Sequence, residues 1–144
     1  MRILLDEDVP IQALDLLDRV LKPHEVRHVT QIRWRKKYDP FLFVDAAARG
    51  YDLLLTNDHG QLSDPRECDA LKKAGIHHVR YDQGKGLRGL ALAVAAILAA
   101  MPDIVEELEG EGGQRLVKIV GLDPRRRRFE VVDPQKEPPT YWSR

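Results

Sequence analysis

The stretches Arg2-Ile3-Leu4-Leu5-Asp6 and Leu53-Leu54-Leu55-Thr56-Asn57-Asp58 decide the fold that this sequence predicts. Each begins with a short apolar run, which is typical of a buried strand. Each then ends in an aspartate, so that an acid follows directly after the strand. Apolar residues at helical spacing occur between and after the two stretches. This alternation predicts an α/β fold with a central, mostly parallel sheet and helices on both faces.

The alternation continues outward from these stretches to about residue 109. Asp39-Pro40 and Asp64-Pro65 each pair a capping acid with a proline, which favours the start of a helix. Beyond this core at 1–109, the segment 114–133 predicts a C-terminal β-hairpin that extends the sheet edge or makes a dimer contact. The proline-rich segment 134–144 is expected to be a loosely ordered tail. The other expected elements are strands at 25–29 and 76–81 and a long helix at 87–109, kinked or divided at Pro102.

The composition indicates one ordinary globular domain. The chain has 144 residues, of which 43% are hydrophobic and 32% charged, so disorder along the whole chain is excluded. The single cysteine, Cys68, excludes an internal disulfide and fits a reducing compartment. No signal-peptide pattern is present, and the apolar run 89–101 is too short to span a bilayer. We therefore expect a cytoplasmic protein with no membrane partner.

The two aspartates that follow strands, Asp6 and Asp58, predict a carboxylate site. In an open parallel sheet, ligands bind beyond the C-terminal ends of the strands, where the winding reverses. The first and third strands can lie side by side, which would bring these two carboxylates into one crevice. Clustered carboxylates repel each other unless a cation is present, and oxygen ligands favour Mg²⁺ or Mn²⁺. Such ions activate water and stabilise charge on a phosphoryl group, as in nucleases and phosphatases.

Several other side chains could join this site, although each also has a structural interpretation. Asp39 and Asp64 can cap helices, and Asp8 can cap the first helix. Asp45 can belong to a solvated helix face. Further candidates of this kind are Glu7, which can point elsewhere, and the loop residue His59, which can assist a leaving group or be a bystander.

The charge is local, because 23 basic and 23 acidic residues give a formal net charge of zero. A general basic field for nucleic acid is therefore excluded. The segment Arg33-Trp34-Arg35-Lys36-Lys37 could instead bind a phosphate backbone, with Trp34 stacking on a base. The alternative is a solvated loop with Trp34 in the core. Arg125 to Arg128 form a second basic run, which could bind RNA or an acidic partner or form a solvated turn.

The stretches at 1–8 and 53–58 resemble two hallmarks of the PIN-like family, a hydrophobic strand followed by acids and a strand ending in Thr-Asn-Asp. Asp39 stands where the family often carries an acid, and the resemblance covers roughly residues 1–82. It implies a three-layer PIN-like fold over residues 1–133 and a metal-dependent ribonuclease. It also implies Asp6, Asp39 and Asp58 as catalytic residues, with Asp6 and Asp58 as metal ligands. Many relatives are VapC-like toxins inhibited by a small antitoxin, and small relatives often form homodimers.

The sequence departs from the family pattern at Gly60, where relatives often carry a second acid. Asp64 could replace that acid, and otherwise the metal site is incomplete. A catalytically degenerate PIN-like module that binds RNA or a partner is therefore an alternative. A receiver-like phosphoacceptor domain is another, because Asp52-Leu53-Leu54-Leu55 is similar to the third strand of receivers. Against the receiver, Thr56-Asn57 intervene before Asp58.

Overall fold

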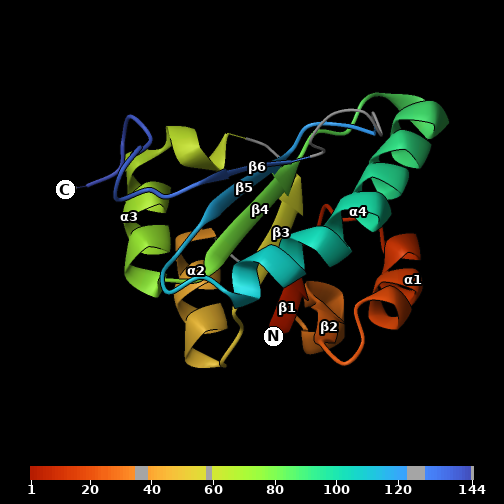
Figure 1. Cartoon of the computed structure of the whole chain (residues 1–144), viewed down its shortest axis with the longest axis horizontal. Helices are drawn as coiled ribbons and strands as arrows, with labels where there is room; N and C mark the ends of the chain where they lie inside the picture. The colour runs from red at the N-terminus through yellow and green to blue at the C-terminus, as the bar shows by residue number, and fades with distance from the viewer. Residues whose placement is uncertain (35–38, 58–59, 123–128, 144) are drawn as a thin grey trace.

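A computed structural model of the chain describes residues 1–34, 39–57, 60–122 and 129–143 (Figure 1). Strands and helices alternate as far as α4, as the apolar patterns predict. The elements are β1 (Arg2–Leu5), α1 (Gln12–Val20), β2 (Glu25–His28), η1 (Val29–Ile32), α2 (Asp39–Ala48), β3 (Leu53–Asn57), η2 (Gln61–Ser63), α3 (Pro65–Ala74), β4 (His77–Tyr81), α4 (Gly86–Glu109), β5 (Leu116–Ile119) and β6 (Phe129–Val132).

The strands form one sheet in the order β2-β1-β3-β4-β5-β6. All neighbouring pairs are parallel except β5 and β6, which are antiparallel. The prediction of an α/β fold with a mostly parallel sheet is therefore confirmed, as is the predicted contact between the first and third strands. The chain passes from β1 to β2 on one side and then to β3 on the other. The winding thus reverses at β1, where such sheets bind ligands.

Helices cover both faces of the sheet and complete three layers. In Figure 1, α1 and α4 lie over one face, and α2 and α3 lie over the other. The side chains of β1 alternate between these faces, because successive residues of a strand point in opposite directions. Ile3 and Leu5 belong to the core cluster that α1 and α4 cover, whereas Leu4 belongs to the cluster under α2 and α3. This double burial explains the uninterrupted apolar run of β1.

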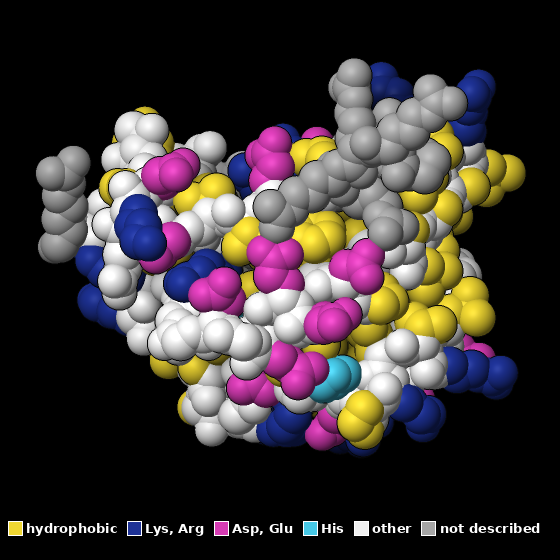
Figure 2. Space-filling model, viewed as in Figure 1, with side chains coloured by type: hydrophobic (Ala, Val, Ile, Leu, Met, Phe, Trp, Pro, Cys, Tyr) yellow, Lys and Arg dark blue, Asp and Glu magenta, His cyan; other side chains and the backbone are white. Residues whose placement is uncertain are grey.

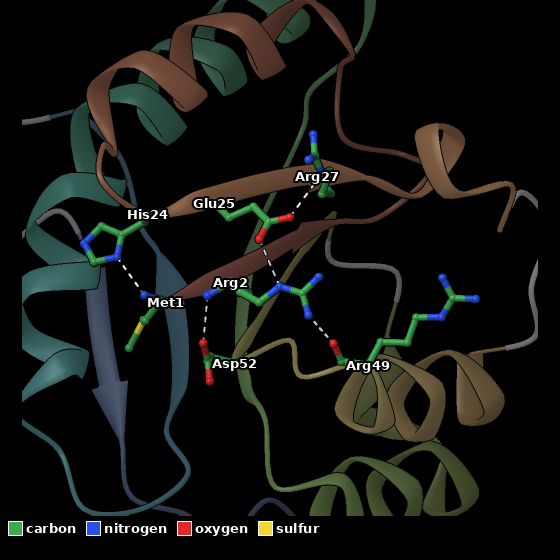
Figure 3. A network of polar contacts seen from close by, with 7 residues as sticks. All are labelled: Met1, Arg2, His24, Glu25, Arg27, Arg49 and Asp52. Carbon is green, nitrogen blue, oxygen red and sulfur yellow. Dashed lines mark hydrogen bonds and ion pairs between the residues drawn. The ribbon is translucent and has the colours of Figure 1, made fainter.

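A polar network centred on Arg2 joins the N-terminal ends of β1, β2 and β3 (Figure 3). The Arg2 Nε donates to Glu25 Oε2 at 3.0 Å, and its Nη1 donates to the Arg49 carbonyl oxygen. The backbone N–H of Arg2 donates to Asp52 Oδ2 at 2.7 Å, and its guanidinium lies 4.5 Å from the ring centroid of Tyr51. The Arg2 hydrogen bond lowers the pKa of Glu25. These contacts hold the three strands at the edge opposite Asp6.

The longest helix, α4, is a core helix of the domain. It runs from Gly86 to Glu109 with Pro102 inside it, so of the two expected effects of Pro102, a kink or a division, the division does not occur. Among the described residues it is the one helix long and apolar enough to cross a membrane. A helix that is buried in a protein core can have the same length and apolar character. Its inner face packs on the sheet through Ala93, Ile97, Ala100, Met101, Ile104, Val105 and Leu108.

The C-terminal part of the chain completes the sheet. β5 pairs in parallel with β4, and β6 pairs with β5, so the predicted hairpin extends the sheet edge. The described part of the C-terminal segment, 134–143, differs from the loosely ordered tail that its composition predicts. The Trp142 side chain is only 8% exposed, the Ser143 hydroxyl donates to Asp69 at 3.2 Å, and Lys72 donates to the Ser143 carbonyl oxygen. Composition alone does not show that Trp142 fits an apolar site near α3.

The start of α4 packs closely against the loop before it, which predicts a specific sensitivity to substitution. A Cβ atom added to Gly89 would overlap the backbone carbonyl of Gly84, whereas one added to Gly112 would meet no atom. Gly89→Ala should therefore lower the free energy of unfolding by about 1–3 kcal/mol, measured by urea denaturation. Gly112→Ala is the matched control and should leave it nearly unchanged. Equal stabilities for the two variants would contradict the close approach.

Candidate functional site

Asp6 is a nearly buried carboxylate at the C-terminal end of β1. The residue is 9% exposed. Its backbone N–H donates to the Leu55 carbonyl oxygen at 2.9 Å, which continues the pairing of β1 with β3. Leu5 is in register with His28, where β2 also ends, and with Leu55 of β3, which continues two residues further to Asn57. Asp6 therefore lies at the point where the sheet reverses its winding, as the sequence predicts.

Both oxygens of the Asp6 carboxylate accept a hydrogen bond. The Thr56 hydroxyl donates to Oδ2 at 2.8 Å, and the backbone N–H of Glu7 donates to Oδ1 at 2.7 Å. Thr56 is 1% exposed and lies in β3, so the bond joins the two central strands. A buried carboxylate requires such partners, because burial without them costs several kcal/mol. Hydrogen bonding of this kind is compatible with binding of a cation, because a carboxylate oxygen has more than one lone pair.

Two more side chains hold the turn that follows Asp6. The turn is closed by the Val9 N–H, which donates to the Asp6 carbonyl oxygen at 3.0 Å. His28 Nε2 lies 2.9 Å from the Val9 carbonyl oxygen, and the Tyr81 hydroxyl donates to the Asp8 carbonyl oxygen at 3.2 Å. His28 ends β2, which is next to β1, and Tyr81 ends β4, which lies beyond β3 on the other side. The acidic turn is thus held on both sides.

Sequence reasoning did not single out Thr56, His28 or Tyr81 as site residues. The available signal was positional, since each stands in the last two residues of a strand of the parallel sheet. Polar side chains at the C-terminal ends of such strands face the ligand edge. Their partners are 19 to 73 positions away along the chain, which local patterns do not reveal.

A shallow hollow of about 400 Å³ adjoins the acidic turn. Its polar lining includes Glu7 and Asp8 from the turn and His28 and Thr30 from β2 and η1. Both acids are exposed there. An anionic ligand would meet negative charge in this hollow, and a bound cation would offset that repulsion.

Two of the three predicted catalytic residues cannot be placed fully. Asp58 lies outside the described residues, as does His59. The last described residue before Asp58 is Asn57, which ends β3 beside β1. Asp39 is the first residue of α2, and nothing is described of its side chain. α2 lies in the connection from the C-terminal end of β2 to the N-terminal end of β3. Asp39 therefore begins this helix at the C-terminal edge of the sheet, which is also the edge that carries Asp6.

The structure gives Asp64 a capping role. Its carboxylate accepts from the Arg66 backbone N–H at 2.8 Å at the start of α3, and these Arg66 contacts lower its pKa. The structural interpretation of Asp64 is therefore confirmed. Gly60 adopts a left-handed conformation with φ +77°, which L side chains rarely adopt. An acid at position 60 would be strained in this backbone.

The remaining secondary candidates differ in position. Asp8 follows Asp6 in the acidic turn, but α1 begins at Gln12 with Ile11 as its N-cap residue, so the expectation that Asp8 caps this helix is wrong. Asp45 is half-buried on α2 and lies within the helix, away from its first turn. Of these two candidates, Asp8 therefore lies in the same turn as Asp6, whereas Asp45 belongs to a helix.

The predicted RNA-binding segment is only partly described. Arg33 is exposed, with φ +61°, and Trp34 is half-buried against the core. The Arg49 guanidinium lies 4.9 Å from the centroid of the Trp34 ring and covers one face of it. The rest of the segment, Arg35, Lys36 and Lys37, lies outside the described residues, as do Arg125 to Arg128. Base stacking on Trp34 stays a prediction.

Within the described part of the chain, no three His, Cys, Asp or Glu side chains form a group that could hold a metal ion. Asp6 does offer oxygen atoms of the kind that Mg²⁺ and Mn²⁺ prefer as ligands, so a site for such an ion would need further ligands beside it. The predicted second ligand, Asp58, is not among the described residues.

Comparison with known proteins identifies no relative. No protein-family model, no curated protein and no solved structure matches this chain. Its function is therefore inferred from the residues and their geometry.

The bond between Thr56 and Asp6 predicts a stability effect that is separate from catalysis. Thr56→Val removes the donor while keeping the side-chain shape, and leaves the buried carboxylate with one partner fewer. The free energy of unfolding, measured in the presence of a chelator, should fall by about 1.5–3 kcal/mol. Thr56→Ser keeps the hydroxyl and should lose less. A valine variant as stable as the wild type would show that this bond does not hold Asp6.

The buried phenol of Tyr81 predicts a distinct response to alkali. Burial, and then the charges of Asp8 and Asp6, raise the pKa of Tyr81. A raised pKa contributes stability below the unfolded value of about 10, and that stability is lost as the pH rises above it. Between neutral pH and strong alkali, the free energy of unfolding should therefore fall more steeply in the wild type than in Tyr81→Phe. Tyr141→Phe, at a residue 49% exposed, is the matched control. Parallel pH curves for wild type and Tyr81→Phe would contradict the shift.

Proposed function

We propose that this chain is a PIN-like, divalent-metal-dependent endoribonuclease centred on Asp6. The observation that carries the proposal is the burial of an oriented carboxylate at the reversal point of a parallel sheet. Acids are rarely buried unless they are paired, and a buried acid at a ligand-binding edge is a candidate functional group. The short Thr-Asn-Asp stretch beside it supports a PIN-like assignment.

In this proposal Asp6 and Asp58 bind Mg²⁺ or Mn²⁺ directly, and Asp39 completes the shell or orients water. The ion would supply activation of water and stabilisation of charge on the phosphate. Thr56 holds the Asp6 carboxylate in one orientation, and His28 and Tyr81 keep the acidic turn in place. Preorganisation of this kind lowers the cost of assembling the site around a substrate.

The substrate and partners follow from the same proposal. RNA would be held by the basic segment 33–37, whose cations can pair with backbone phosphates. The chain would act in the cytoplasm as the toxin of a toxin–antitoxin pair, with a small antitoxin protein as its inhibitor.

A catalytically degenerate module that binds RNA or a partner protein is a second candidate. The observation that favours it is that two positions considered for a metal ligand, 60 and 64, offer none that is free of another role. Position 60 holds a glycine in a left-handed conformation, and the Asp64 carboxylate caps α3. Thermal unfolding with added Mg²⁺ separates the candidates, because a ligand that binds the folded state raises the unfolding temperature. A degenerate module should show no such rise.

One structural observation favours a receiver-like domain, and another argues against it. The order β2-β1-β3-β4-β5 is the order of doubly wound folds such as that of receivers. After β5, however, the chain forms the antiparallel strand β6 where the alternating pattern of strands and helices would continue with a helix. Incubation with acetyl phosphate tests this candidate, which requires a phosphorylated Asp58.

The decisive prediction for the nuclease concerns Asp6. Asp6→Asn removes the charge that would bind the ion but keeps the side-chain size. Cleavage of labelled single-stranded RNA with Mg²⁺ or Mn²⁺ should fall at least about 100-fold, or about 2.7 kcal/mol in barrier height. Addition of chelator should abolish cleavage by the wild type.

Asp15→Asn is the matched control, because Asp15 is 81% exposed on α1 and pairs only with its helical neighbour Arg19 among the ion pairs described. It should cleave as the wild type does. Circular dichroism confirms that each variant is folded. Full activity in folded Asp6→Asn would show that the site lies elsewhere.

A further inference from the structure

Arginine side chains from separate elements form one surface beside β2 and α2. Glu25 Oε2 accepts from Arg2 Nε at 3.0 Å, and Glu25 Oε1 accepts from Arg27 Nε at 3.2 Å. The Nη1 of Arg2 in turn donates to the Arg49 carbonyl oxygen, so that contacts link the three residues (Figure 3). The arginine surface consists of Arg2, Arg27, Arg33 and Arg49.

The arginine surface lies on the side of the sheet that α2 and α3 cover. Arg27 is level with Leu4 in the pairing of β2 with β1, and Leu4 belongs to the core cluster under these helices. Level residues of paired strands point to the same face. Because β2 is the outer strand of the sheet, this part of the face is open. The side chains of Arg2 and Arg27 are 40% and 49% exposed.

Arg27 lies close to the carboxylate site. Asp6 follows Leu4 by two residues, on the strand next to that of Arg27. Strands rise by about 3.3 Å per residue and lie about 4.8 Å apart, so the Cα atoms of Asp6 and Arg27 are about 8 Å apart. This distance is comparable to the spacing of neighbouring phosphates in an extended strand of RNA. A strand that crosses the Asp6 edge can therefore reach Arg27 with its next phosphate.

Positive charge is in excess on the arginine surface. Glu25 pairs with two of its members, and Asp52 accepts from the backbone of one. Within the described part of the chain, the exposed side chains of Arg33 and Arg49 have no ion-pair partner. Guanidiniums that come from separate elements form a row. Such a row suits a polymer with a phosphate at each residue better than one small anion, which requires donors that converge.

The contact between Arg49 and Trp34 gives the tryptophan a role other than base stacking. The Trp34 ring is half-buried against the core cluster under α2 and α3, and the Arg49 guanidinium lies 4.9 Å from its centroid. The N–H donors of a guanidinium lie in its own plane, so a stacked guanidinium can still form a bidentate pair with a phosphate. The ring therefore holds Arg49 in place and leaves its donors accessible.

The face of the molecule that α4 forms is unsuited to a polyanion. Figure 2 shows acidic side chains gathered near the centre of this face, over the C-terminal half of α4. The acids Asp103, Glu106, Glu109 and Glu111 are exposed in and just after this half of the helix. They would repel a phosphate backbone. RNA that reaches the Asp6 edge is therefore favoured to approach from the α2 side.

We propose that Arg27 and Arg49 bind the phosphate backbone of the single-stranded RNA substrate, and that Trp34 positions the Arg49 guanidinium. The proposal rests on the proposed function, because that function supplies RNA as the ligand. It extends the basic segment 33–37 with two arginines that lie outside it in the sequence. Trp34 is then a positioning residue rather than a platform for a base.

The test measures binding in the absence of cleavage. Fluorescence anisotropy of a labelled oligouridylate is followed in chelator over a range of salt concentrations. The logarithm of the association constant falls linearly with the logarithm of the salt concentration, and each phosphate contact of a single strand contributes about 0.7 to the slope. Arg27→Gln and Arg49→Gln should each reduce the slope by about this amount, and the double variant by about 1.4.

Trp34→Leu distinguishes a positioning role from base stacking. If the ring only holds Arg49, this change should weaken binding in the wild-type background but have no further effect in Arg49→Gln. If a base stacks on the ring, Trp34→Leu should weaken binding equally in both backgrounds, because stacking does not depend on Arg49. The second result would overturn the role of Trp34.

Arg19→Gln is the matched control, since Arg19 also pairs with one acid, is 71% exposed, and lies on α1 over the opposite face of the sheet (Figure 1). Its slope should equal that of the wild type. Circular dichroism confirms that each variant is folded. Unchanged slopes in both Arg27→Gln and Arg49→Gln would overturn the proposal, as would a wild type that does not bind the oligouridylate at low salt.

Two further outcomes separate this proposal from its alternatives. Polyglutamate that displaces the oligouridylate as well as unlabelled oligouridylate does would overturn the assignment to RNA and favour an acidic protein partner. A wild type that binds through Arg27 and Arg49 but cleaves no RNA with Mg²⁺ or Mn²⁺ would contradict the nuclease activity and support the phosphate contacts. The two proposals therefore fail separately.

Discussion

β1 is the element on which the rest of this structure depends. All four of its residues pair with β2, and the three apolar residues Ile3, Leu4 and Leu5 also pair with β3 and are fully buried. A strand in this position cannot shift by one residue without exposing its apolar side chains to the wrong face. The Arg2 network fixes its N-terminal end. Asp6 is therefore delivered to one defined place, at the edge where the winding reverses.

That placement imposes a cost which the surrounding residues offset. A carboxylate that follows a buried strand loses much of its contact with water, so the fold must supply hydrogen-bond donors. Thr56 and the Glu7 backbone do so, while His28 and Tyr81 hold the adjoining turn. In the function that we propose, the negative charge of Asp6 would be offset by a divalent cation bound at this edge.

α4 shows a different division of roles within one element. Its inner face completes the core under one side of the sheet, which accounts for its length and apolar character. Its ends have no acid in the first turn and no base in the last, so burial of the inner face, and not the helix dipole, accounts for the stability of α4.

The sequence by itself determined the order of strands and helices, the parallel sheet, the adjacency of β1 and β3, and the position of Asp6 after a buried strand. These features depend on local apolar patterns and on general rules for parallel sheets. Only the tertiary structure decided that Thr56 holds Asp6 from 50 positions away, that Asp64 caps α3 whereas Asp8 caps no helix, and that Trp142 is buried. The reason is physical: a side chain's partner is set by packing between distant segments, which no local pattern encodes.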